Sequence, residues 1–347
     1  MKNRLLALSC LCLLVLNTAG SAIGDVGAKR KASPANQLAA MLPATDGIVT
    51  IDVKRFLSDA MPKLLASNPA MLGRLTEHMD EMKATTGVDF RQFDHAAIGI
   101  RARKIAEKKY DIDPVVITRG QVSTAALIEA AKTAANGKHR EEKIGNRTIY
   151  LFPSKAAVDK AKQQVPTASP QAVDTIARKL PKDIAVVALD GNTLLFGEDT
   201  LVRQAVSERP AANPLLKFLG KKETSIVDFA GKLPGGMSAF IPLDNDELGK
   251  NIDSIQFVYG NMDMITDGMV MNVTARTLQP AQATALLETL EGLQIIGKAF
   301  LGGSKGADKQ VYARLIDNAK FSAKGNEVIF DLQVAQGDID VLAGLLK

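Results

Sequence analysis

Four methionines are the side chains in this sequence whose type and spacing best match a known chemistry. They are Met262, Met264, Met269 and Met271, in the stretch GNMDMITDGMVMN. Thioethers bind copper(I), and an oxidising compartment is where they replace thiolates as ligands. Residues i and i+2 of a strand share a face, and a turn near 266–268 would bring the two Met-x-Met pairs side by side. The stretch therefore predicts a candidate soft-metal site.

The same pattern also fits an ordinary core strand pair. Methionine is a common core filler, and the flanking Asn and Asp residues alternate with the methionines, so they would point to the opposite face. A hairpin that buries its methionine face against helices is the simpler interpretation. Both interpretations make the four methionines neighbours.

The three histidines do not form a ligand pattern. They are His78, His95 and His139, and no two have the i, i+4 spacing of a helical metal site. Asp94 and His95 are adjacent, but neighbours in a strand point to opposite faces. We expect each histidine to be exposed or hydrogen-bonded, without a metal.

The motifs of a phosphate-binding loop, a nucleophilic serine and a calcium-binding loop are absent or matched only in part. GGSKG at 302–306 follows a helix and lacks the ending of a phosphate-binding loop, and no Gly-x-Ser-x-Gly turn occurs. The acidic stretch from Asp244 has a glycine in the sixth position, but Leu248 and Ile255 stand where a calcium loop needs oxygen ligands. We expect helix capping there. No cofactor and no catalytic residue is assigned.

Both cysteines lie in a segment with the layout of a signal peptide. Lys2 and Arg4 precede an apolar run from Leu5 to Leu16, and small residues follow, with a cut expected after Ala22. The run is shorter than the roughly 20 residues of a membrane-spanning helix. A retained anchor or lipidation of Cys10 or Cys12 fits the pattern less well. Removal of residues 1–22 would leave no thiol chemistry.

Charge and aromatic content argue against a nucleic-acid binder. The net charge is +5 over 347 residues, with no tryptophan and four tyrosines, whereas such proteins combine a basic face with stacking rings. The basic run RARKIAEKKY at 101–110 lies between two expected strands. We expect it to be a solvated hairpin or loop, with contact to an anionic surface as the alternative.

Hairpins separated by helices favour an α+β fold with antiparallel sheets and helices packed on one face. Hairpins are expected around Gly145-Asn146, around Asp190-Gly191-Asn192 and around Lys324-Gly325-Asn326. Helices are expected over 123–135, 198–209, 280–301 and 307–318.

A faint internal repeat suggests two similar modules. The segments beginning at Met41 and Lys232 both run Leu-Pro, turn residues, an apolar strand, an Asp and a helix start. We therefore expect a signal peptide at 1–22, a flexible basic linker at 23–36, a first α+β module at 37–209 and a second at 210–347.

Two stretches resemble uncharacterised bacterial exported proteins of the domain-of-unknown-function type. These are LPATDGIVTIDVKRFL from Leu42 and NTLLFGEDTLVRQAV from Asn192. The resemblance implies export and architecture, and it carries no catalytic residues.

The function expected from these observations is binding or scaffolding by an exported soluble protein in the periplasm or cell envelope. It would be non-enzymatic, its partner would be a protein or an envelope component, and the mature chain would have no transmembrane segment. Two alternatives remain: a carrier of an apolar ligand, and a hydrolase that uses Asp and Glu residues paired only in space.

Overall fold

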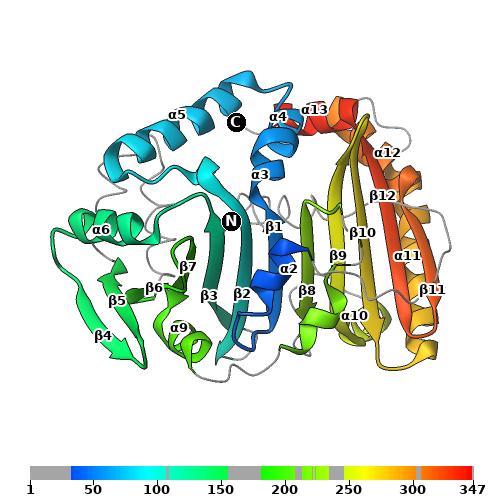
Figure 1. Cartoon of the computed structure of the whole chain (residues 1–347). Helices are drawn as coiled ribbons and strands as arrows, with labels where there is room; N and C mark the ends of the chain where they lie inside the picture. Colours follow the sequence, from blue (N-terminus) through cyan, green and yellow to red (C-terminus); the bar gives the residue numbers. More distant parts are fainter. Residues whose placement is uncertain are drawn as a thin grey trace. The chain divides into compact units, whose positions relative to one another are not determined.

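The computed structural model describes residues 33–106, 109–154, 181–207, 213–220, 222, 224–233, 246–301 and 306–345. Its elements are shown in Figure 1, and they divide into two units. The first unit comprises Ser33–Lys54 and Arg74–Lys217, and the second comprises Arg55–Gly73 and Phe218–Lys347. The second unit thus includes a segment from the first half of the chain. The modules expected at 37–209 and 210–347 follow sequence order and stay a prediction.

The first unit contains an antiparallel sheet of strand order β1-β2-β3-β7-β6-β5-β4. Its helices include α2 (Pro34–Ala39), α6 (Thr124–Ala134) and α9 (Asp199–Val206). The strands are β1 (Gly47–Asp52), β2 (Phe93–Ala106), β3 (Lys109–Gly120), β4 (Arg140–Ile144), β5 (Arg147–Pro153), β6 (Asp183–Ala188) and β7 (Thr193–Glu198). Fully buried aliphatic side chains such as Ile117, Leu195 and Leu201 form its core.

The second unit has an antiparallel sheet of strand order β11-β12-β10-β9-β8. The strands are β8 (Val227–Lys232), β9 (Ile255–Ile265), β10 (Gly268–Thr277), β11 (Lys320–Lys324) and β12 (Glu327–Ala335). Burial alternates along β12, where Val328, Phe330, Leu332 and Val334 are buried. This period of two marks one face of the sheet as the core face.

Three long or terminal helices cover that core face. Figure 1 shows α11 (Pro280–Leu301) and α12 (Ala307–Asn318) alongside the sheet, and both pack on β12. Helix α13 (Gln336–Gly344) packs on β10 and β12. Shorter elements of this part of the chain are α10 (Asp246–Asp253), η1 (Phe56–Ala60) and α4 (Met61–Leu64).

The remaining helices have residues in both units. Helix α3 spans Val53–Arg55, α5 spans Pro69–Thr86, and the 3-10 turn η3 spans Pro214–Phe218. A second 3-10 turn, η2 (Phe90–Gln92), belongs to the first unit. Helix α4 ends at Leu64, and α5 begins at Pro69, where proline's missing amide N–H is tolerated in a first turn.

The α+β class with antiparallel strands and helices is confirmed. The three expected hairpins form, and Gly145 and Gly325 adopt positive φ of 59° and 61° at their turns. Ser123 caps α6 by accepting the amide N–H of Ala126. These features are local, because turn and cap chemistry depends on neighbours in sequence.

Several expectations fall outside the described residues. They concern the signal peptide at 1–22, residues 23–32 of the linker, the second repeat strand within 234–245, and residues 302–305 of GGSKG. The similarity of the two modules and the internal repeat therefore stay predictions.

Candidate functional site

The four methionines do lie together, in the hairpin of β9 and β10. Met262 is directly opposite Met271, and Met264 is directly opposite Met269. Directly opposed residues share a face at Cβ separations of about 5 Å. The sequence therefore predicted their proximity correctly.

Their surroundings are those of a hydrophobic core. Met264, Met269 and Met271 are 7%, 2% and 1% exposed, and the cluster also holds Phe330, Leu332, Val334 and Ile339. Met262 is partly buried against the same cluster. This packing favours the core-filling interpretation, and the copper(I) site stays a prediction.

The histidines lie apart from one another along the chain. His78 is on α5 with its Nδ1 3.7 Å from Glu81, and the Nε2 of His139 lies 3.1 Å from Glu141. The Nδ1 of His95, on β2, is buried without a hydrogen-bond partner. Within the described ranges, no group of three or more His, Cys, Asp or Glu side chains is placed to hold a metal ion.

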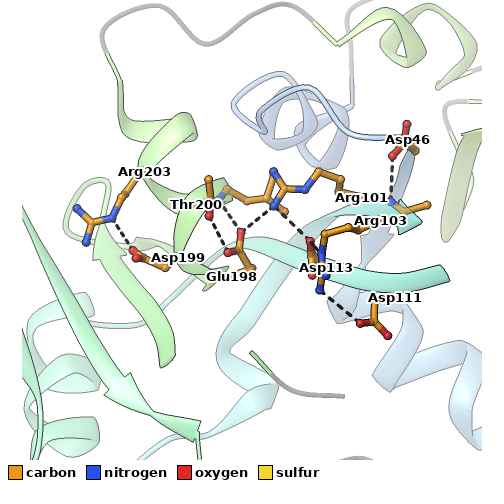
Figure 2. A network of polar contacts seen from close by, with 11 residues as sticks. Asp46, Arg101, Arg103, Asp111, Asp113, Glu198, Asp199, Thr200 and Arg203 are labelled. Atoms are coloured by element: carbon orange, nitrogen blue, oxygen red, sulfur yellow. Dashed lines mark hydrogen bonds and ion pairs between the residues drawn. The ribbon is translucent and has the colours of Figure 1, made fainter. Parts of the chain in front are cut away.

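A polar network in the first unit joins β2, β3 and α9, as Figure 2 shows. Arg101 donates to Asp113 at 3.3 Å and to Glu198 at 3.1 Å. The side chain of Arg103 lies 3.3 Å from Asp113 and 3.4 Å from Asp111. The hydrogen bond to Asp113 raises the pKa of Arg103. Sequence spacing could not show that Glu198 meets these residues, because it lies about a hundred residues further along the chain.

The basic run forms the expected hairpin, and residues 103–106 are exposed to solvent. Its two arginines also pair with acids of β3 and with Glu198. Glu198 also caps α9 by accepting the amide N–H of Leu201 at 3.0 Å. The carboxylates of Asp113 and Glu198 converge on Arg101, whose positive charge lies beside both of their negative charges. Their arrangement holds the hairpin to the start of α9.

The exposed side of α11 is the candidate interaction surface. Four large apolar side chains on its C-terminal half are exposed: Leu293 (42%), Ile295 (68%), Ile296 (65%) and Phe300 (83%). We call these four residues the outer stripe. Leu293, Ile296 and Phe300 follow i, i+3, i+7 spacing and therefore line one side of the helix.

Buried contacts along α11, most of them in its N-terminal half, hold the helix in a defined orientation. Ala283 and Leu286 are buried, with Leu287 and Leu290 packed beside them. Gln294 donates from Nε2 to the backbone oxygens of Ile316 and Ala319, at 2.6 and 2.8 Å. Leu293 follows the buried Leu286 by seven residues, and Phe300 follows Leu293 by seven, so the three lie on nearly the same side of the helix. That side is buried in the N-terminal half of α11 and exposed in its C-terminal half.

The sequence predicted α11 but missed the outer stripe. The helix is apolar on most of its circumference near Gln294–Leu301, so periodicity does not show which side faces the sheet. A helix that is apolar on all sides is normally buried, so an apolar helix on a protein's outside is the signal that could have pointed to an interaction surface. Of the helices described, none is both long and apolar enough to cross a membrane.

Comparison with known proteins shows no family for this chain. No family model matches the chain, and no curated protein matches it. Solved structures of TP0453 are similar: crystal form IV is 11% identical, with 91% of this chain and 97% of that chain covered at a TM-score of 0.45. Crystal form III is 12% identical, with 88% and 98% covered at a TM-score of 0.42. The chain therefore matches no characterised family.

Proposed function

We propose that this is an exported, non-enzymatic binding or scaffolding protein of the periplasm or cell envelope, and that the outer stripe is its binding surface. The observation that carries the proposal is the exposure of Ile295, Ile296 and Phe300, each above 60%, on one ordered helix. Complete burial of such a side chain contributes about 1.5–3 kcal/mol. Covering the stripe with an apolar partner surface would therefore drive association.

The surface around the stripe is polar, as at a reversible interface. Lys298 lies on the same helix and pairs with Asp317 of α12 at 3.2 Å. Glu291 is exposed one turn before Ile295. An apolar centre with a charged rim is typical of binding sites on proteins that also exist free.

A crosslinking experiment tests this surface directly. A photoreactive residue replaces Ala299, which lies between Ile296 and Phe300, and the protein is irradiated in its envelope fraction. We expect one discrete adduct in the wild-type background and its loss in I296S/F300S. Because both substituted side chains are exposed, the free energy of unfolding should change by less than about 0.5 kcal/mol per site.

The matched control is Ile112→Ser in β3, because Ile112 is exposed to a similar degree, 61%, and lies outside α11. It should keep the adduct. An adduct of unchanged yield in I296S/F300S, or no adduct in the wild-type background, would refute the proposal. An adduct of twice the chain mass would identify a second copy, and native mass spectrometry would reveal a carried apolar ligand, the alternative function.

A further inference from the structure

Helix α11 carries charges of both signs at one edge of the outer stripe. Glu291 and Lys298 are seven residues apart, so they lie on nearly the same side of the helix. Ile295 follows Glu291 by four residues and precedes Lys298 by three, so it lies one turn from each. All three side chains are exposed. The two opposite charges therefore flank Ile295, about 10 Å apart along the helix axis.

This edge is complementary to itself when two α11 helices lie antiparallel. A twofold axis near Ile295 brings Glu291 of each helix to the level of Lys298 of the other, which gives two ion pairs, because a twofold interface repeats every contact. In a parallel pair the charged edge would instead face the edge that carries Leu293 and Phe300. The charges would then have no partner, so they favour the antiparallel arrangement.

Lys298 can contact a second carboxylate while it keeps its first. Its ammonium lies 3.2 Å from Asp317 of α12, and the two side chains are 43% and 60% exposed. An ammonium has three donor hydrogens, and exposed ion pairs are weak. In the antiparallel arrangement Lys298 lies between Asp317 of its own chain and Glu291 of the second copy.

Small residues at the middle of the exposed surface leave room for another helix. Gly292 and Ala299 are seven residues apart and lie between Ile295 and Ile296 around the helix. A Cβ added at Gly292 would meet no other atom within 4 Å, so this position faces open space. Because the distance between packed helices depends on the side chains at the contact, the isoleucines of two copies can pack closely across the axis.

The charge of α11 fits a second copy better than an anionic membrane surface. The helix has two acidic side chains, Glu288 and Glu291, and one basic side chain, Lys298. Helices that lie on membranes are typically rich in Lys and Arg on their polar face. A surface with both signs at matching positions is instead suited to its own copy.

We propose that the outer stripe binds a second copy of this chain, with two α11 helices antiparallel across a twofold axis near Ile295. This inference rests on the proposed function, because it names the partner of the same surface. One helix face per copy is smaller than the roughly 800 Å² per partner of a standard interface. We therefore expect a weak, reversible dimer with a Kd of about 10–100 μM.

Sedimentation equilibrium of the purified protein, over concentrations from about tenfold below to tenfold above that Kd, tests the proposal. The mass of the wild type should rise from one chain to two, and I296S/F300S should keep the mass of one chain. Glu291→Lys and Lys298→Glu each turn two attractive pairs into two repulsive ones. Each should raise the Kd of the dimer about tenfold.

Mixing the two charge variants distinguishes a second copy from any other partner. In a mixed dimer of Glu291→Lys and Lys298→Glu, each lysine again faces a glutamate, so an equimolar mixture should dimerise more tightly than either variant alone. Labelling one variant with ¹⁵N lets native mass spectrometry identify the mixed dimer. Glu77→Lys is the matched control, because Glu77 is exposed on α5, outside α11; it should keep the wild-type Kd.

Two results would overturn the proposal. One is a wild-type protein that keeps the mass of one chain at every concentration; a crosslinked adduct at position 299 in the envelope fraction would then give the stripe a different partner and leave the proposed function standing. The other is a dimer whose Kd is the same in both charge variants, or a mixture that dimerises no more tightly than they do. Absence of both the dimer and the adduct would refute the proposed function as well.

Discussion

A single carboxylate, Asp89, shows how strongly one residue's surroundings can change its acidity. Its Oδ1 accepts from Nε of Arg91 at 2.8 Å and from the Arg91 amide N–H at 3.1 Å, while Lys83 lies 3.1 Å from Oδ2. The side-chain hydrogen bond from Arg91 is the largest of the effects that lower the pKa of Asp89 to about 2. Asp89 is 7% exposed.

Replacing Asp89 should therefore change how stability depends on pH in acid. Because the folded pKa is below the unfolded value of about 4, this group stabilises the fold fully above that pH. The stabilisation is lost as the pH falls toward 2. In urea unfolding between pH 5 and pH 2, D89N should be less stable than the wild type at pH 5, and the two should converge at pH 2.

The control for this measurement is D80N. Asp80 also binds Arg91, at 2.7 Å, but its side chain is 59% exposed, so solvent screens its contribution. D80N should keep the acid slope of the wild type. A D89N curve parallel to that of the wild type would contradict the role of Asp89.

Copper(I) binding by the methionines is a second prediction about single residues. Replacing Met262 and Met264 by Leu changes volume little, so the free energy of unfolding should fall by less than about 1.5 kcal/mol per site. If the thioethers bind copper(I), the double variant should lose affinity in a competition titration with a copper(I) chelator. Unchanged affinity would leave core packing as the role of all four methionines.

At the scale of elements, Glu198 links the start of α9 to the hairpin of β2 and β3. It accepts the Leu201 amide N–H, the Thr200 hydroxyl at 2.8 Å and Arg101. Its side chain is 17% exposed. Loss of a helix cap typically costs about 1–2 kcal/mol.

We expect Glu198→Ala to lower the free energy of unfolding by about 1–2 kcal/mol, measured as a shift in urea midpoint at constant m-value. Glu198→Gln keeps an acceptor for the cap and removes the charge that faces Arg101, so its loss should be smaller. Equal stability of the Ala variant and the wild type would show that the network carries no stability.

Sequence patterns predicted where helices and strands form better than they predicted which of their side chains are exposed. The hairpin of β4 and β5 was predictable because Gly145-Asn146 is a local turn signal. The exposure of the outer stripe was not predictable, because Leu286 and Leu293 share a side of α11, and only packing on β10–β12 decides that Leu286 is buried and Leu293 is not. The pairing of Arg101 with Glu198 could not be predicted from the sequence, because it depends on β7, which ends at Glu198, lying beside β3.

At the scale of the whole chain, export predicts a processed protein. If residues 1–22 act as a signal peptide, the mass of the protein recovered from the envelope should correspond to a chain that begins at Ile23. Both cysteines would then be absent, and reducing agents should leave Tm unchanged. A recovered mass that includes residues 1–22 would contradict processing.

By itself the sequence determined the class of the fold, the places of its main hairpins and helices, and the proximity of the four methionines. Each follows from residues close together in the chain, through turns, caps and a two-residue alternation. Only the tertiary structure decided that Glu198 lies beside Arg101, since strand register is set by packing between distant segments. It likewise decided that the outer stripe stays exposed. Whether a side chain is buried depends on which residues pack against it, and in this fold those residues come from segments far away in the sequence.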